Sequence, residues 1–104
     1  MINEIKWSPV AEEDFYNILQ YLIEKFGLKV ADDFQVALNQ TLSIILINPF
    51  AFPSFRKKNI RKCVFNSRLS IYYLIKEDGT IFLLTLFGRQ NPAKLKKLIR
   101  KSIK

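Results

Sequence analysis

The residues of this chain that could do chemistry are cations rather than nucleophiles. The sequence contains no histidine, which removes the commonest general acid–base group and the commonest metal ligand. Its single cysteine, Cys63, has no histidine to act as a base, so we interpret it as a small strand residue. Three glycines are too few for a glycine-rich phosphate loop, and no Cys/His cluster could hold zinc. We therefore expect no metal and no cofactor.

The candidate site residues are cations and two tyrosines in the second half of the chain: Arg61, Lys62, Arg68, Arg89, Tyr72 and Tyr73. Side chains alternate along a strand, so Arg61, Cys63 and Phe65 should share one face. By the same rule Tyr72 and Tyr73 should point to opposite faces, one into the core and the other free to be exposed.

Arg89 lies between a strand end at Gly88 and a helix start at Asn91-Pro92. Two interpretations remain open for it. Its guanidinium could bind an anion beside the N–H groups of that helix. Alternatively, it could pair with a helix carboxylate such as Asp14 and hold the C-terminal segment in place.

Three segments predicted as strands, 59–66, 69–76 and 81–87, must position these residues. They are rich in β-branched and aromatic residues and are separated by turns. Asp78-Gly79 suits a two-residue hairpin turn between the last two. Those two segments are apolar at successive positions, which predicts a sheet that is covered on both faces.

Two helices, joined as an antiparallel hairpin, should cover one of these faces. Ser8-Pro9 supplies an N-cap and a first helical residue, and Gly27 supplies a C-terminal stop. The second helix should span 28–47 and be the more buried, because its apolar stripe is wider. The predicted stripes are Ala11, Phe15, Ile18, Leu22 and Phe26 in the first helix and Ala31, Phe34, Leu38, Leu42 and Ile45 in the second.

The remaining segments complete one α+β domain over residues 1–104, in the order β-α-α-β-β-β(-α). A short strand at 3–7 should precede the helices, and three loop aromatics should pack against them: Phe50, Phe52 and Phe55. Segment 93–104 is a basic amphipathic helix, for which we favour packing on the second sheet face over a membrane surface or a partner. The expected architecture is an antiparallel sheet with a helical hairpin on one face and a short C-terminal helix.

Charge divides the chain, whose net charge is +8, into an acidic and a basic half. Residues 1–52 hold three Lys/Arg against seven Asp/Glu, a net charge of −4, whereas residues 53–104 hold fourteen against two, a net charge of +12. The basic half predicts an acidic partner (nucleic acid, anionic lipid or acidic protein) unless the charge serves only solubility. We see neither a signal peptide nor an apolar segment of membrane-spanning length, so we expect a cytoplasmic protein with no membrane association.

Several short patterns occur together. The N-terminal one is W-S-P-x-A-x-x-D at 7–14, and the others are Phe26-Gly27, Asn48-Pro49, Ile60-Arg61-Lys62, Ile71-Tyr72-Tyr73 and Arg89-Gln90-Asn91-Pro92. With them the chain resembles, over nearly its whole length, the RelE/ParE toxin superfamily of type II toxin–antitoxin modules, often called plasmid stabilisation proteins. The resemblance implies a mixed sheet under a helical hairpin and a small cytoplasmic toxin that forms an oligomer with an acidic antitoxin.

The superfamily has two branches, and the resemblance favours one of them. RelE-like toxins cleave mRNA on the ribosome with basic residues and a C-terminal tyrosine, whereas ParE-like toxins inhibit DNA gyrase by binding. Arg61 and Arg89 match basic positions of the ribonucleases. Cys63, Ser70 and Leu95 stand where further cations and the tyrosine are expected, and each missing charge-stabilising contact costs about 3 kcal/mol.

We therefore expect a ParE-like gyrase inhibitor that is not an enzyme. A ribosome-dependent mRNA endoribonuclease, with Arg61 and Arg89 as catalytic residues, is the alternative, and a non-toxic degenerate member is a third. The expected contacts to antitoxin or target are three cations, Arg61, Lys62 and Arg89, and three apolar residues, Leu95, Leu98 and Ile99.

Overall fold

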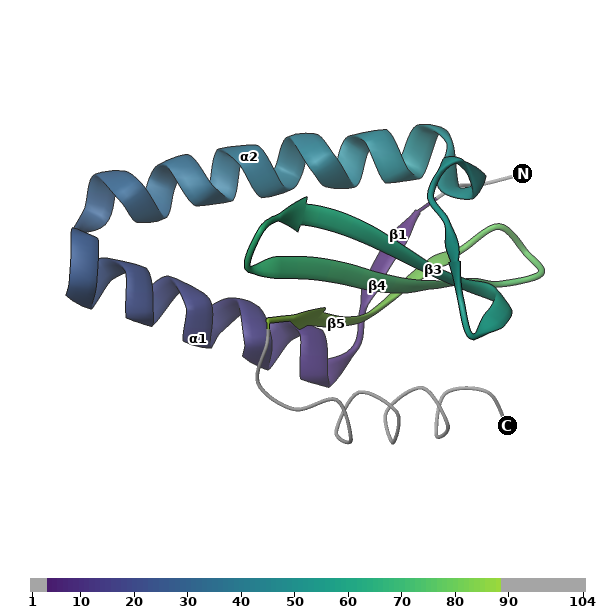
Figure 1. Cartoon of the computed structure of the whole chain (residues 1–104), viewed down its shortest axis with the longest axis horizontal. Coiled ribbons are helices and arrows are strands. Elements are labelled where there is room, and N and C mark those ends of the chain that lie inside the picture. Colours follow the sequence, from purple (N-terminus) through teal and green to yellow (C-terminus); the bar gives the residue numbers. More distant parts are fainter. Residues whose placement is uncertain (1–3, 89–104) are drawn as a thin grey trace.

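A five-stranded sheet with a helical hairpin on one face forms the body of the protein (Figure 1). The structure is a computed structural model and describes residues 4–88. In chain order its elements are β1 (Ile5–Trp7), α1 (Pro9–Phe26), α2 (Leu28–Ile47), the 3-10 helix η1 (Pro49–Ala51), β2 (Ser54–Phe55), β3 (Lys57–Asn66), β4 (Leu69–Ile75) and β5 (Ile81–Phe87). The predicted α+β class is confirmed, whereas the predicted helix at 93–104 lies outside the described residues.

The strand order is β1-β5-β4-β3-β2. Strands β3, β4 and β5 form the predicted antiparallel meander, but β1 pairs with β5 in parallel, Ile5 opposite Ile81 and Trp7 opposite Leu83. The sheet is therefore mixed rather than purely antiparallel. Strand β2, which the sequence placed in a loop, pairs with the start of β3 at the other edge.

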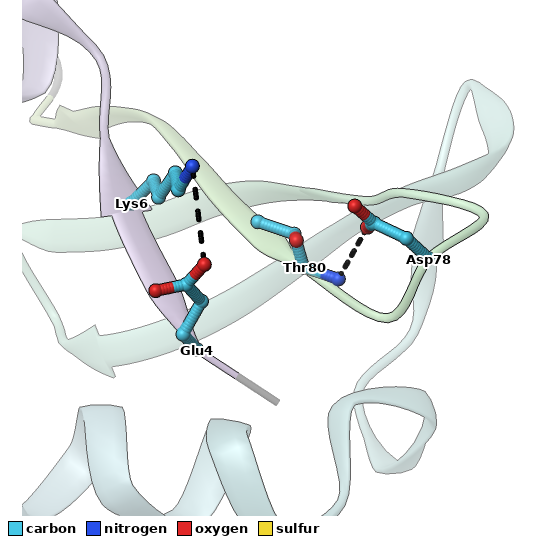
Figure 2. A network of polar contacts seen from close by, with 4 residues as sticks. All are labelled: Glu4, Lys6, Asp78 and Thr80. Atoms are coloured by element: carbon cyan, nitrogen blue, oxygen red, sulfur yellow. Dashed lines mark hydrogen bonds and ion pairs between the residues drawn. The ribbon is translucent and has the colours of Figure 1, made fainter. Parts of the chain in front are cut away.

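The turn between β4 and β5 consists of the three residues 77–79, which lie between the hydrogen-bonded Lys76 and Thr80. The prediction of a two-residue turn was therefore wrong. The Lys76 N–H donates to the Thr80 carbonyl at 2.9 Å, and the Gly79 N–H donates to the Lys76 carbonyl at 3.0 Å. Gly79 has φ 91°, the left-handed conformation that such a loop places at its last residue. The Asp78 carboxylate accepts the Thr80 N–H at 2.9 Å, as Figure 2 shows beside the β1 residues, and this bond lowers the pKa of Asp78.

The main core lies between the hairpin and one face of the sheet. It is built from one buried residue of α1, buried residues of α2 and inward residues of every long strand; the largest are Leu38, Ile45, Ile71, Tyr73, Ile81 and Leu83. The prediction that the second helix is the more deeply buried is therefore confirmed. Phe26, which was assigned to the stripe of the first helix, is 60% exposed at the tip of the hairpin.

The opposite face of the sheet carries a second, smaller cluster of buried residues: Ile60, Tyr72 and Leu84. Tyr72 is 4% exposed and Tyr73 is fully buried, so the expectation that one of them is exposed was wrong. The two rings do point to opposite faces, but each face has a cluster that takes one in. Burial on both faces agrees with the non-alternating sequence of β4 and β5.

A β-bulge in β5 is the place where the first helix is attached. Tyr72 pairs with Thr85 and Tyr73 with Leu83, so Leu84 is an extra residue with no opposite number in β4. Ser8, the N-cap of α1, supplies hydrogen-bond donors to the β5 backbone at this bulge. Its N–H donates to the Leu83 carbonyl at 3.0 Å, and its hydroxyl donates to the Leu84 carbonyl at 2.9 Å.

The same hydroxyl also caps the N-terminus of α1. The Ser8 oxygen accepts the Ala11 N–H at 2.9 Å, which is the N-cap bond expected from the sequence. One turn further along, the Asp14 carboxylate accepts two hydrogen bonds from β5, from the Thr85 hydroxyl and from the Leu86 N–H at 3.1 Å. Helix α1 is therefore attached to β5 at two places, by Ser8 at its start and by Asp14 in its second turn.

We predict that Asp14→Ala lowers the free energy of unfolding by about 3 kcal/mol. The variant loses two hydrogen bonds to a charged group and leaves their donors unpaired in a partly buried place. Chemical denaturation would measure the loss. Glu13→Ala, at the exposed neighbouring position, should change stability by no more than about 0.5 kcal/mol. Equal losses in the two variants would contradict the attachment role of Asp14.

Candidate partner-binding surface

Arg61 lies in β3 on the face that carries the helices, opposite Tyr73 of β4. Its guanidinium donates to the Phe52 carbonyl at 2.9 Å and lies 5.2 Å from the centre of the Phe50 ring. The Nε atom is buried and has no hydrogen-bond partner among the residues that the structure describes. One of the five N–H donors of Arg61 therefore holds the segment after α2 against the sheet.

Tyr73 holds the same segment from the neighbouring strand. Its hydroxyl donates to the Pro49 carbonyl at 2.6 Å. Burial raises the pKa of Tyr73 well above its usual value, Cys63 adds to the rise, and the Arg61 charge opposes it. Together Arg61 and Tyr73 fasten η1 and the residues that follow it to the middle of the sheet.

Of the three loop aromatics predicted to pack against the helices, one does so. Phe52 packs against the main core, but Phe50 is 60% exposed. Phe55 belongs to β2 and packs against the second cluster, with its ring centre 5.0 Å from that of Tyr72. The prediction failed for Phe55 because the short strand β2 carries it to the other face of the sheet.

Lys62, the neighbour of Arg61, lies on that other face. Its ammonium is 5.9 Å from the ring centres of both Phe55 and Tyr72. Two further cations lie over rings of the same cluster: Arg56 is 5.3 Å from the Phe55 ring and Lys76 is 5.0 Å from the Phe82 ring. We call this group the basic aromatic face; it comprises Phe55, Arg56, Lys62, Tyr72, Lys76 and Phe82.

Arg56 has an unusual backbone within this face. Its φ is 64°, and it is the one residue other than glycine with a positive φ in the described part of the chain. The left-handed conformation costs an L-residue roughly 1–2 kcal/mol. The kink separates β2 from β3 and carries the Arg56 side chain over the Phe55 ring.

The structure therefore separates the predicted site residues. Arg61 and Lys62 lie on opposite faces of β3, so their charges do not converge on one phosphate. Arg89, together with the predicted apolar contacts Leu95, Leu98 and Ile99, lies outside the described residues. Sequence reasoning missed four residues of the basic aromatic face: Phe55, Arg56, Lys76 and Phe82. Side-chain alternation could have indicated the last two, because positions 74, 76 and 82 are even-numbered, like the meander residues that face away from the helices.

The described residues offer little for catalysis. Cys63 is 2% exposed and burial raises the pKa of its thiol, so it is a poor nucleophile. No group of three His, Cys, Asp or Glu side chains between residues 4 and 88 could hold a metal ion.

An open depression beside β1 is lined by Lys6, Trp7, Glu12, Phe15 and Tyr16. Within the described range, no helix has the length and apolar character that crossing a membrane requires.

The sequence matches one protein family over residues 5–92, that of the ParE toxin of the type II toxin–antitoxin system, parDE. The chain belongs to the ParE toxin family. No curated protein matches it. The RelE/ParE resemblance read from the short sequence patterns is thereby confirmed.

Two solved structures share the fold of this ParE-family chain. One, from the chromosomal ParDE toxin–antitoxin system of P. aeruginosa, has 16% identity and a TM-score of 0.70, and the match covers 84% of this chain and 96% of that one. The other, a copper-bound mutant toxin from Helicobacter pylori, has 20% identity and a TM-score of 0.57, with 85% and 96% covered. At these identities the likeness shows the fold alone.

We predict that Tyr73→Phe makes stability less sensitive to alkaline pH. In the native protein the pKa of Tyr73 lies above its unfolded value near 10, so its contribution is complete below about pH 10 and is lost as pH rises toward the native pKa. Denaturation at several pH values from about 8 to about 11 would show a steeper fall for the parent than for the variant. Tyr16→Phe, at a side chain that is 61% exposed, is the control and should fall like the parent. Parallel curves for all three would refute the prediction.

Proposed function

We propose that this ParE-family toxin inhibits growth by binding DNA gyrase and is neutralised by an acidic antitoxin. Its family membership over residues 5–92 is the observation that carries the proposal. The arrangement of cations supports a binding role. A phosphoryl-transfer site needs charges that converge on one phosphate, whereas Arg61 is engaged by the Phe52 carbonyl and Lys62 lies on the opposite face.

The basic aromatic face supports the antitoxin part of the proposal. Its three cations lie over aromatic rings, so apolar surface and positive charge are offered together. An acidic, amphipathic segment of an antitoxin would match both properties. We propose that Lys62 belongs to this contact, with Arg61, Arg89, Leu95, Leu98 and Ile99 as the further contact residues to antitoxin or target.

The target is tested by inducing the toxin without its antitoxin. We expect DNA-damage signalling and intact mRNA in the cells, and inhibition of supercoiling when the purified protein is added to gyrase. Ribosome-dependent cuts in mRNA that disappear in Arg89→Ala would instead establish the ribonuclease alternative. Normal growth on induction, with unchanged supercoiling, would identify a non-toxic member of the family.

We predict that Lys62→Glu weakens binding of the acidic antitoxin encoded beside the toxin by at least about tenfold, because attraction becomes repulsion at a partly desolvated position. Titration calorimetry at two salt concentrations would measure the change, and the difference between parent and variant should shrink at high salt. Lys25→Glu, on the exposed side of the hairpin, is the matched control and should bind like the parent. Equal affinity of the two variants would remove Lys62 from the contact.

A further inference from the structure

The open depression beside β1 is a second candidate binding site, formed by different residues from the basic aromatic face. Its volume is about 710 Å³, and its lining combines three aromatic rings with one carboxylate and one ammonium. Two of the rings are supported from behind. Trp7 meets Phe15 edge-on, with 5.5 Å between the ring centres, and Phe15 stacks on Phe34 of α2 at 6.3 Å. The aromatic wall is therefore in place before a ligand arrives, which lowers the cost of binding.

Glu12 supplies the uncompensated charge of this depression. The Lys6 ammonium lies 3.8 Å from the Glu4 carboxylate, and Figure 2 shows these two side chains directed toward each other. Glu12 forms no ion pair within residues 4–88. All the lining residues belong to the acidic half of the chain, residues 1–52, where three Lys/Arg stand against seven Asp/Glu. The depression therefore attracts a cation.

An arginine side chain matches this lining in both of its properties. The planar guanidinium stacks on aromatic rings and binds a carboxylate through two parallel N–H bonds. A lysine ammonium is a compact, strongly hydrated point charge and cannot make either contact in this way. The rings of Trp7 and Tyr16 and the carboxylate of Glu12 offer the two kinds of partner together.

The free edge of β1 lies beside the depression. Strand β1 is the outermost strand of the sheet and pairs with β5 on one side only. The Ser8 N–H donates to the Leu83 carbonyl of β5 at 3.0 Å, so residues 4, 6 and 8 direct their backbone groups inward. By alternation, Ile5 and Trp7 direct their N–H and C=O groups outward, where no strand of the described chain lies. An extended peptide can pair with such an edge.

We propose that this corner binds an arginine carried by an extended basic segment of another protein. The segment pairs with Ile5 and Trp7 as an added strand, and its guanidinium contacts the rings and the Glu12 carboxylate. A peptide is a better ligand than a free guanidinium compound, because the depression is open and a small-molecule site encloses most of its ligand. A second copy of this chain would bring its own net charge of +8, and the two copies would repel each other. The proposal does not depend on the antitoxin, which we place on the basic aromatic face.

The fluorescence of Trp7 reports on this site directly, because it is the only tryptophan of the chain. Titrating the full protein with acetyl-Thr-Val-Arg-Val-Thr-amide should change the emission to saturation. The same peptide with citrulline in place of arginine keeps the shape and loses the charge, and should bind at least about tenfold more weakly. Glu12→Gln should weaken binding of the arginine peptide at least about fivefold and leave the citrulline peptide unaffected. Glu13→Gln, at the exposed neighbouring position, is the matched control and should bind like the parent. Equal affinities for the two peptides, or in the two variants, would overturn the proposal.

N-methylated forms of the arginine peptide test the added strand. Alternate N–H groups of an extended peptide face the same side, so methylation of one alternate set should abolish binding and methylation of the other should not. Arginine amide, which has the guanidinium without the strand, should bind at least about tenfold more weakly than the peptide. Equal binding of arginine amide would assign the depression to small guanidinium compounds and overturn the peptide. Emission that changes with protein concentration alone would place a second copy in the site, and no saturable change with the arginine peptide would leave the site without its ligand; either result would also refute the proposal.

Discussion

The hydrogen bonds between the first two turns of α1 and the bulge in β5 are the constraint on which the rest of the fold depends. At and beyond the bulge, side chains at the start of α1 bind the backbone of β5: the Ser8 hydroxyl donates to the Leu84 carbonyl, and the Asp14 carboxylate accepts the Leu86 N–H. Backbone groups of this kind would be costly to bury without a partner. This fixes α1 over β5, and because Gly27 turns the chain directly into α2, it also sets where the second helix meets the sheet.

This attachment explains the W-S-P-x-A-x-x-D pattern in structural terms. The indole of Trp7 packs edge-on against the Phe15 ring, with 5.5 Å between the ring centres. Ser8 caps the helix and binds the bulge, Ala11 is fully buried, and Asp14 accepts a hydrogen bond from the β5 backbone. The most recognisable part of the sequence therefore builds the scaffold. The cations that we propose as contacts for an acidic partner lie elsewhere, on the meander and at Arg56 between β2 and β3, and side-chain alternation divides those of β3 between two faces.

The sequence predicted those features that depend on local chemistry. The caps at Ser8 and Gly27, the two helices and the three meander strands follow from residue type and period. It did not predict the parallel pairing of β1 with β5, because that contact joins segments far apart in the chain and three residues carry little pattern. Strand β2 has two residues and shows no alternation to detect. For the site, alternation separated Arg61 from Lys62, but the engagement of Arg61 by Phe52 depends on a loop path that no sequence period encodes.

The left-handed backbone at Arg56 shows how the basic aromatic face is tied to the main chain. Glycine would adopt this conformation without cost, yet an arginine stands there and holds its guanidinium over Phe55. The cation is thus held at a backbone position whose conformation is unfavourable for most residues with a side chain. Replacement by glycine would relieve the backbone and remove the charge in a single step, so at this position backbone conformation and the cation–π contact with Phe55 favour different amino acids.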